Sequence, residues 1–526
     1  MTGRRSLAQI IGLSLLLGLT VFFRFWHLEQ KLLWHDELAT RVFAAGYTVD
    51  EWKRALYTGE IFDVADVERF QHLNPARSVG AAIRGLAEDD PQHPPLYYVL
   101  ARLWVLTFGD RIATLRALSA LFSLLSIPLM YWLARELFDS EPIAMFSAAL
   151  FGVSPFFVLY AQEAREYALW TGLIVLSNAS LLRAIRLTGA ETRVSGKLAG
   201  AWGLYSLATV LSLYTSFTSA SMIIAQLLYL CFRERLRPTR VAAMSFVALA
   251  VSALAFLPWA VELLRHYDAF QVSMRWSREI HIPRTALIRI LGQNISRTVV
   301  DLGHDVEGPV DYAAMLPAVA LVVAAFGWLA ARAPRNSSAL LLLLFVVPIG
   351  MLIGPDLLSG GIRSVSTRYM TPAWVTAIPA LGFLLATPHP EKRWWPAFPA
   401  LVIGTAIASS AGNVTRFTSW TKATSVSLPK VAEAINAEPH ALLVGNLERH
   451  NPGNLMALAV LLRPGTKMQF LDVKMEEHWV LPRDVGTVFL FSPIPEYRAA
   501  MEEREHVKTR LVLQDTFLDL WKIEGY

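Results

Sequence analysis

The 526-residue sequence has one cysteine and few charged residues. The single thiol, Cys231, excludes an intrachain disulfide and any cysteine-based metal site. Charged residues make up 17% of the chain, against about 25% in a typical soluble domain. Because a charge in hydrocarbon is costly, this deficit indicates a chain embedded in a bilayer.

The sequence also lacks the signatures of common soluble enzymes. It has no glycine-rich dinucleotide motif after a strand, no P-loop, no H-E-x-x-H zinc motif and no G-x-S-x-G nucleophile motif. We find no internal repeat and no low-complexity tract. Any chemistry must therefore come from polar residues placed at a membrane surface.

Long apolar runs are what the sequence has instead. About eleven of them are long enough to cross a bilayer as helices. They lie at 7–25, 112–133, 143–160, 168–187, 199–215, 217–232, 241–260, 312–331, 339–354, 369–387 and 395–411. The first run follows Arg4 and Arg5, and no small-residue cleavage site comes after it. This pattern predicts an uncleaved span with a cytoplasmic N-terminus.

The segment 94–109 is also apolar, but it is short and contains Arg102. If it lies in the membrane interface, the basic clusters at 183–197 and 233–240 both face the cytoplasm, as the positive-inside rule requires. Letting it cross would move most of these charges outside. We therefore predict a non-crossing segment, a bacterial inner-membrane location and a periplasmic or extracellular C-terminus.

Three segments are then exterior: the first loop (27–111, with interfacial helices), the loop 261–311 and the tail. In the tail, strand-like runs begin at Ala441, Met468, Thr487 and Phe517, and helical segments lie after Ser427 and near 453–462 and 495–505. The predicted fold class is an α-helical integral membrane protein with a small C-terminal α/β domain. We place the boundary between residues 1–411 and 412–526.

Two polar clusters stand out in the first exterior loop. Trp34-His35-Asp36-Glu37 places two adjacent acids near a membrane, where partial desolvation raises a carboxyl pKa toward the range of a general base. The alternative is a helix N-terminus whose acids complement the helix dipole. His93, in the stretch Gln92 to Tyr98, can donate to a phosphate or an acid, or can be an interfacial histidine without a role.

Two further clusters follow. Glu163-Ala-Arg165-Glu166-Tyr167 lies in a short exterior turn, where charges between apolar runs must pair or bind something. Glu163 and Tyr167 are spaced to share a helix face, and an internal salt bridge is the alternative. Arg368, followed by Tyr369, stands at the start of the tenth span, where a guanidinium can grip phosphate oxygens or simply anchor at the interface. The predicted topology puts all four clusters on one side.

With these motifs the sequence resembles the GT-C superfamily of polytopic glycosyltransferases, in the branch of the protein O-mannosyltransferases and the lipid A aminoarabinose transferases. The resemblance rests on Trp34 to Glu37, His93-Pro-Pro-Leu-Tyr97-Tyr98, Phe108-Gly-Asp110, Leu115 to Ala120, Glu163 to Tyr167 and Arg368-Tyr369-Met370. It covers residues 1–235 well and 236–411 loosely.

The resemblance implies an enzyme that moves a sugar from a polyprenyl-phosphate donor to an envelope acceptor on the non-cytoplasmic face. Asp36 matches the essential first-loop acid and would act as the base, with Glu37 beside it. The donor phosphate and sugar would be bound by His93, Tyr97, Glu163, Arg165, Glu166, Tyr167, Arg368 and Tyr369, and either Glu163 or Glu166 matches the second acidic position. A single displacement predicts inversion at the sugar carbon.

Other readings remain open at this stage. Asp36 with Glu163 or Glu166 offers the oxygen ligands that Mg²⁺ or Mn²⁺ prefers, so a divalent metal is one hypothesis. A transporter or flippase of a lipid-linked saccharide and an envelope glycan ligase are the alternative functions. We expect no nucleic-acid partner. The sequence names neither the sugar nor the acceptor.

Overall fold

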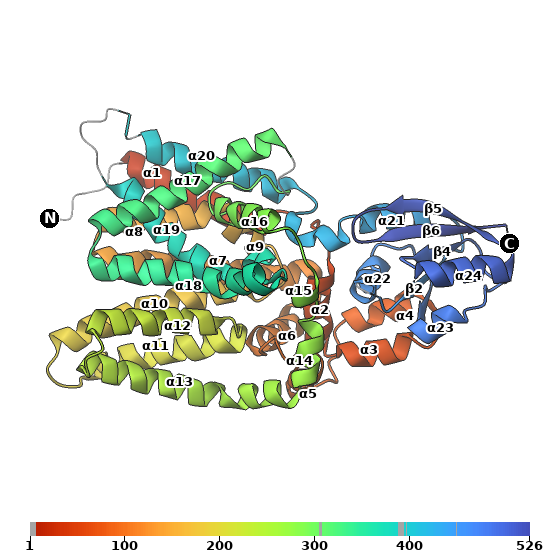
Figure 1. Cartoon of the computed structure of the whole chain (residues 1–526), viewed down its shortest axis with the longest axis horizontal. Coiled ribbons are helices and arrows are strands. Elements are labelled where there is room, and N and C mark those ends of the chain that lie inside the picture. The colour runs from red at the N-terminus through yellow and green to blue at the C-terminus, as the bar shows by residue number, and fades with distance from the viewer. Residues whose placement is uncertain (1–6, 305–307, 388–393, 396, 449, 526) are drawn as a thin grey trace. The chain divides into compact units, whose positions relative to one another are not determined.

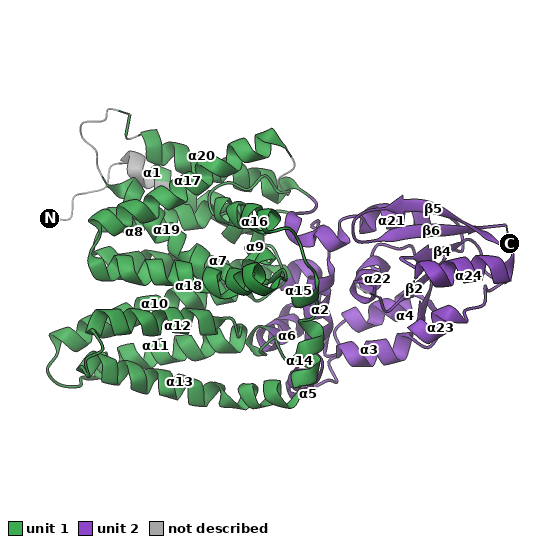
Figure 2. Ribbon diagram, in the orientation of Figure 1, with its two compact units in different colours: residues 1–28, 90–97, 116–416 green, residues 29–89, 98–115, 417–526 purple. Residues whose placement is uncertain are grey.

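The computed structural model describes every residue except 1–6, 305–307, 388–393, 396, 449 and 526. The chain is mostly helical, with one sheet formed near its C-terminus (Figure 1). It divides into two compact units (Figure 2). Unit 1 comprises residues 1–28, 90–97 and 116–416, and unit 2 comprises residues 29–89, 98–115 and 417–526.

Each of the eleven predicted apolar runs is helical in the structure. The helices are α1 (Leu7–Phe25), α7 (Ile112–Phe138), α8 (Glu141–Val153), α9 (Pro155–Ala161), α10 (Tyr167–Ala190), α11 (Gly196–Thr215), α12 (Ser219–Glu234), α13 (Arg240–Arg265), α17 (Pro309–Arg332), α18 (Arg335–Ser359), α19 (Thr371–Ala386) and α20 (Ala397–Thr415). One run is shared by α8 and α9, which bend by 53° at Ser154.

Seven helices of the described residues are long and apolar enough to cross a membrane, and the bent pair α8–α9 raises the number to eight. In the apolar stretch within residues 367–386, which includes α19, 83% of the residues are buried. In the apolar stretch of α13 only 22% are buried. The exposed side chains of α13 include Phe246, Val247 and Leu254, as expected of a helix that faces lipid. The chain is therefore a multi-pass membrane protein.

The connections of unit 1 alternate between its two ends, as Figure 1 shows for α10 to α13. The α10–α11 and α12–α13 turns lie at one end, and they carry the basic clusters 183–197 and 233–240. The α9–α10 and α11–α12 turns lie at the other end. Both basic clusters thus lie at the same end of unit 1.

The predicted interfacial segment is the short helix α6 (Leu96–Phe108). Arg102 in this helix is fully buried and donates to the carbonyl oxygens of Ala44 at 2.9 Å and Asn74 at 3.0 Å. These contacts give partners to the two terminal nitrogens of a guanidinium that would be costly in the middle of a bilayer. Helix α6 is also too short to appear among the candidate spans.

Unit 2 is built on a six-stranded sheet in the order β1-β3-β2-β4-β6-β5. The strands are β1 (Ile61–Asp63), β2 (Leu442–Asn446), β3 (Lys467–Leu471), β4 (Val488–Phe491), β5 (Lys508–Gln514) and β6 (Asp519–Glu524). Strands β3, β2 and β4 are parallel, and the outer pairings are antiparallel. Tail helices α21 (Leu428–Asn436), α22 (Asn451–Ala459), α23 (Val473–Glu477) and α24 (Pro495–Glu505) accompany them.

The first exterior loop contributes to the same unit. It supplies α2 (His35–Ala45), α3 (Val49–Leu56), α4 (Val64–Glu68), α5 (Val79–Asp89) and the edge strand β1. Loop residues Leu38, Trp52 and Val67 share one buried apolar cluster with tail residues Leu455 and Phe489. Loop and tail thus form one folded body around one core. The predicted fold class is confirmed.

Candidate active site

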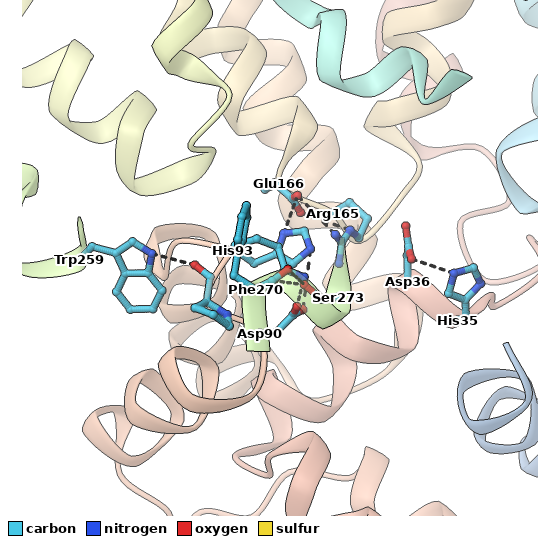
Figure 3. A network of polar contacts seen from close by, with 11 residues as sticks. His35, Asp36, Asp90, His93, Arg165, Glu166, Trp259, Phe270 and Ser273 are labelled. Carbon is cyan, nitrogen blue, oxygen red and sulfur yellow. Dashed lines mark hydrogen bonds and ion pairs between the residues drawn. The ribbon is translucent and has the colours of Figure 1, made fainter. Parts of the chain in front are cut away.

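A buried ionic cluster lies in the turn between α9 and α10 of unit 1 (Figure 3). Glu166 is held by two cationic side chains: Arg165 Nε lies 3.2 Å from its Oε2, and His93 Nδ1 lies 3.4 Å from its Oε1. Asp90 approaches the other nitrogen of His93, with 3.8 Å between Oδ2 and Nε2. The turn is anchored by Gln162, whose amide donates to the carbonyls of Phe23 and Trp26 at 2.9 Å.

The expected helix across this turn is wrong. Residues 162–166 are turns and bends, and α10 begins only at Tyr167. Glu163 and Tyr167 therefore do not share a helix face. The expected internal salt bridge is present as the pair of Arg165 with Glu166. Burial of both carboxylates and of Arg165 makes this turn a concentrated charged site in a mostly apolar unit.

The charges of this cluster shift each other's pKa. Burial by itself lowers the pKa of His93, but the Asp90 carboxylate and the contact with Glu166 outweigh burial and raise it above its ordinary value. Burial would raise the pKa of Glu166, yet the Arg165 charge and the His93 contact lower it to about 2. The arrangement thus favours an ionised Glu166 facing a protonated His93.

Tyr167 lies beside Arg368, the last of the predicted cationic residues, as well as beside Arg165. Its ring lies 5.8 Å from the guanidinium carbon of Arg165 and 5.8 Å from that of Arg368, although Arg368 is two hundred residues away in sequence, in the 3₁₀ turn Thr367–Met370. Arg368 also lies 5.4 Å from the ring of Tyr369. The Tyr167 hydroxyl is buried and has no hydrogen-bond partner among the described residues. Two guanidiniums and an unsatisfied phenol therefore converge in unit 1.

The loop that carries Arg368 is fixed by a buried acid near the end of α18. Asp356 accepts hydrogen bonds from Arg363 Nη1 at 2.8 Å and from the backbone N–H and hydroxyl of Ser364, both at 2.7 Å. The chain enters this loop through Gly360 and Gly361, whose φ angles are +81° and +115°. Only glycine adopts the second conformation at low cost. The two glycines thus allow the backbone conformations that the loop requires.

Tyr97 supports the same turn from α6. Its hydroxyl lies 2.8 Å from Ser119 Oγ, and Ser119 Oγ donates to the backbone oxygen of Arg165 at 3.2 Å. These hydrogen bonds connect Tyr97 to the backbone of the turn. It holds the peptide that positions Arg165.

Asp36 belongs to unit 2, in the first turn of α2. Its Oδ1 lies 3.0 Å from His35 Nε2 (Figure 3). His35 Nδ1 lies 2.9 Å from Thr424 Oγ1. Both side chains retain partial exposure, 17% for Asp36 and 24% for His35. The result is a carboxylate with solvent access, oriented by an imidazole that the tail holds in turn.

Glu37, the neighbouring acid, has different surroundings. Its side chain is fully buried, and its Oε2 accepts a hydrogen bond of 2.9 Å from the equally buried Lys422. Lys422 also donates to the carbonyl oxygen of Leu32 at 2.6 Å. This ion pair ties the start of α2 to the tail within unit 2.

The sequence-based candidates thus divide between the two units. Unit 1 connects seven of them through hydrogen bonds, ion pairs and cation–π contacts, and Glu163 is buried in the same turn. The seven are His93, Tyr97, Arg165, Glu166, Tyr167, Arg368 and Tyr369. Unit 2 holds Asp36 and Glu37. Sequence reasoning missed Asp90, Ser119 and Lys422. Asp90 lies one turn before His93 and carried a weak signal, whereas a lone serine in an apolar helix and a lone lysine in the tail carried none.

The described residues offer a poor ligand set for the predicted divalent metal. Among the described residues, no three His, Cys, Asp or Glu side chains are grouped to hold a metal ion. Glu166 is already held by a guanidinium and an imidazole, which a metal would have to displace. We therefore derive no step through a metal.

Solved structures share this architecture. The chain aligns with ArnT from Cupriavidus metallidurans, solved bound to undecaprenyl phosphate, over 97% of this chain and 98% of that one, with a TM-score of 0.58 and 13% identity. It aligns with the archaeal oligosaccharyltransferase AglB from Archaeoglobus fulgidus, solved with an inhibitory peptide and a dolichol-phosphate, over 88% of this chain and 65% of that one, with a TM-score of 0.51 and 13% identity. Both alignments show that the chain shares the fold of these two proteins.

A family model gives an independent match to part of this chain. The model described as dolichyl-phosphate-mannose-protein mannosyltransferase matches residues 92–261. The match contains His93 and the whole 162–166 turn, but it ends before Arg368. No curated protein matches the sequence significantly.

Proposed function

We propose that this protein is a glycosyltransferase of the GT-C superfamily that moves a sugar from a polyprenyl-phosphate donor to a hydroxyl of an envelope acceptor. The observation that carries the proposal is the convergence of Arg165 and Arg368 on Tyr167, whose buried hydroxyl lacks a partner among the described residues. Guanidiniums bind phosphate oxygens through paired charge-assisted hydrogen bonds, and a phenol adds a further donor.

The lipid that would occupy the site is suggested by the two structural neighbours. ArnT was solved with undecaprenyl phosphate and AglB with a dolichol-phosphate, and both ligands are polyprenyl phosphates. A donor of this class places its isoprenoid chain among the apolar helices and its phosphate at the helix ends. We place the site on the periplasmic side of a bacterial inner membrane, because the turn of Arg165 lies opposite the basic turns.

The reaction needs charge stabilisation on one side and a base on the other. Cleavage of the bond between the sugar C1 and the phosphate oxygen leaves the electron pair on the phosphate. Arg165 and Arg368 stabilise that negative charge, and protonated His93 adds to the positive field. Glu166 holds Arg165 and His93 in place and stays ionised, since its pKa lies near 2.

Asp36 is the proposed base. The acceptor oxygen attacks C1 as its proton passes to the Asp36 carboxylate, which gives inversion at C1 in one displacement. His35 orients the carboxylate through its 3.0 Å contact. Glu37 is the weaker candidate for this role, because its carboxylate is committed to Lys422. The proposal requires the Asp36 carboxylate to reach the acceptor hydroxyl during turnover.

Asp36→Asn in the full-length protein tests the assignment. Losing a positioned base typically lowers the rate by about 10²–10⁴-fold. We therefore expect transfer of one sugar from a synthetic polyprenyl-phosphate donor to fall by that factor, with unchanged thermal stability. Asp50→Asn is the matched control, because Asp50 also stands in the first turn of a helix of unit 2. Wild-type transfer by Asp36→Asn would refute the role of Asp36.

The same assay separates the alternative functions. A flippase would move a labelled lipid-linked sugar between leaflets without transferring it, and a ligase would need a whole lipid-linked glycan. The hypothesis of Mg²⁺ or Mn²⁺ at Asp36 with Glu163 or Glu166 stays a prediction, and transfer measured with and without EDTA tests it.

A further inference from the structure

A polar cleft lies at the carboxyl ends of β2 and β4 in unit 2. It offers about 450 Å³ of water-accessible space. Its walls come from the loop after β2, the loop after β4 and the turn between β5 and β6, and they include Glu448, Asn451, Ser492, Asp515, Phe517 and Asp519. From β2 the chain crosses to β3 on one side, and from β3 it returns across β2 to β4 on the other. Ligands of open α/β sheets bind at such switch points.

The floor of the cleft is rigid. Asn451 donates from its amide to Asn446 Oδ1 at 2.5 Å, and Asn446 donates to the backbone oxygen of Ser492 at 3.2 Å. Ser492 N–H in turn donates to the backbone oxygen of Asp519 at 2.8 Å. These bonds join the ends of β2, β4 and β6 under the cleft. A ligand would therefore meet a preformed surface rather than order one.

The chemistry of the walls selects the class of ligand. Among the described lining residues three are carboxylates and none is basic, which disfavours a phosphate or another anion. Carboxylate, amide and hydroxyl groups are hydrogen-bonding partners for polyols. The Phe517 ring is 37% exposed and offers an apolar face of the kind that packs against the C–H face of a pyranose. Asp515 Oδ2 is shielded from water and has no hydrogen-bond partner among the described residues.

The cleft leads to Asp36 through aromatic contacts within unit 2. The rings of Phe517 and His450 lie 6.4 Å apart, and those of His450 and His35 lie 5.2 Å apart. His35 in turn contacts the Asp36 carboxylate at 3.0 Å. Helix α22 allows this approach because Gly453 has no side chain: a Cβ there would lie 2.7 Å from the Cβ of His35. A glycan seated on Phe517 would therefore extend toward the proposed base.

We infer that this cleft binds an uncharged or amine-bearing saccharide, and that the saccharide is part of the acceptor. The second half of the inference rests on the proposed function, whereas saccharide binding does not. The three carboxylates among the described lining residues disfavour the donor phosphate in this cleft. In this proposal unit 1 binds the phosphate of the donor lipid, and unit 2 binds the acceptor saccharide.

Binding to the full-length protein in nanodiscs tests the cleft. The probes are three tetrasaccharides measured by calorimetry: mannotetraose, which is neutral, a glucosamine tetramer, which bears amines, and tetragalacturonate, which is anionic. We expect at least one of the first two to bind at least tenfold more tightly than tetragalacturonate. Phe517→Ala and Asp515→Asn should each weaken that binding at least tenfold.

Matched controls keep the result specific. Val473→Ala and Glu496→Gln change an exposed apolar side chain and an acid of unit 2 outside the cleft, and both should bind like the wild type. The inference is overturned if neither mannotetraose nor the glucosamine tetramer binds at 10 mM, or if the cleft and control variants bind alike. Binding of undecaprenyl phosphate, measured on the same samples, reports on the proposed function separately and should not change in Phe517→Ala.

Discussion

Adjacent carboxylates at Asp36 and Glu37 have different surroundings, although the sequence presents them as a pair. Asp36 faces His35 with partial access to solvent, whereas Glu37 is sealed against Lys422. A sequence pattern locates both acids in a first helical turn, but it cannot say which partner each acid contacts. Lys422, the partner of Glu37, lies 385 residues further along the chain. Contacts at this separation depend on the tertiary fold, which local spacing does not encode.

Glu37→Gln should therefore act on stability rather than on chemistry. It leaves the buried Lys422 ammonium without its counter-charge, and breaking a buried pair in this way costs about 3–5 kcal/mol. Thermal unfolding should show a large loss for Glu37→Gln, and the double variant Glu37→Leu with Lys422→Met should recover much of it. A stable Glu37→Gln protein that has lost transfer would instead identify Glu37 as the catalytic base.

His93 makes a pH-dependent contribution to stability. Its pKa in the folded protein lies above the ordinary value of about 6.5, so the contribution is complete below pH ~6.5 and is lost as pH rises through the folded pKa. Glu166 stays ionised throughout this window because its pKa is near 2. The melting-temperature difference between wild type and His93→Gln should shrink as pH rises from about 6 to about 9.

Asp90, Glu166 and Arg165 are the charged groups that act on His93, and none of the three is replaced in this experiment. His478→Gln provides the control, because His478 lies exposed on unit 2. Its melting-temperature difference should be flat over the same range. A flat profile for His93→Gln as well would show that the contact between His93 and Glu166 does not favour the imidazolium.

Among the elements, the apolar helices were predictable and the edge strands were not. A run of twenty apolar residues has one stable form in lipid, because only a helix satisfies its own backbone there. Strand β5, with the sequence KTRLVLQ, is largely exposed at the edge of its sheet and carries a weak apolar pattern. Strand β1 has three residues and exists because it pairs with β3 from the tail. The apolar pattern of β5 is too weak to predict a strand, and β1 depends on a partner far along the chain. Neither strand was therefore predicted.

The loop between α18 and Arg368 offers a test at this scale. In Gly361→Ala the new Cβ would lie 2.7 Å from the backbone oxygen of Ser277, at a φ of +115°. Such a conformation costs a residue with a side chain about 1–3 kcal/mol. We expect a lower melting temperature and weaker binding of undecaprenyl phosphate, because Arg368 lies in the same loop.

Gly354→Ala supplies the comparison within α18 itself. No atom lies within 4 Å of a Cβ at that position, and alanine favours the helix over glycine. Its melting temperature and lipid binding should match or slightly exceed those of the wild type. Equal effects of the two substitutions would mean that the conformation of Gly361 does not position Arg368.

At the scale of the whole molecule, the boundary drawn at residue 411 separates pieces that the structure joins. The periodicity of the tail correctly indicated an α/β body, and strands β2, β3, β4 and β6 match the predicted runs. However, hydropathy along a chain gives no information on which polar segments fold together. The first loop and the tail, more than three hundred residues apart, share a core that includes Leu38, Trp52 and Leu455.

The tail should therefore not fold without the loop. Five large loop side chains in the common core, Leu38, Val42, Trp52, Leu56 and Val67, are almost fully buried. At about 1.5–3 kcal/mol each, their burial contributes on the order of 10 kcal/mol, which is comparable with the whole stability of a domain. Residues 417–526 expressed alone should give poorly dispersed NMR spectra, whereas a fusion of residues 29–89 to 417–526 should give dispersed ones. Trp52→Ala with Leu56→Ala in the fusion should abolish the dispersion, and a well-folded isolated tail would contradict the shared core.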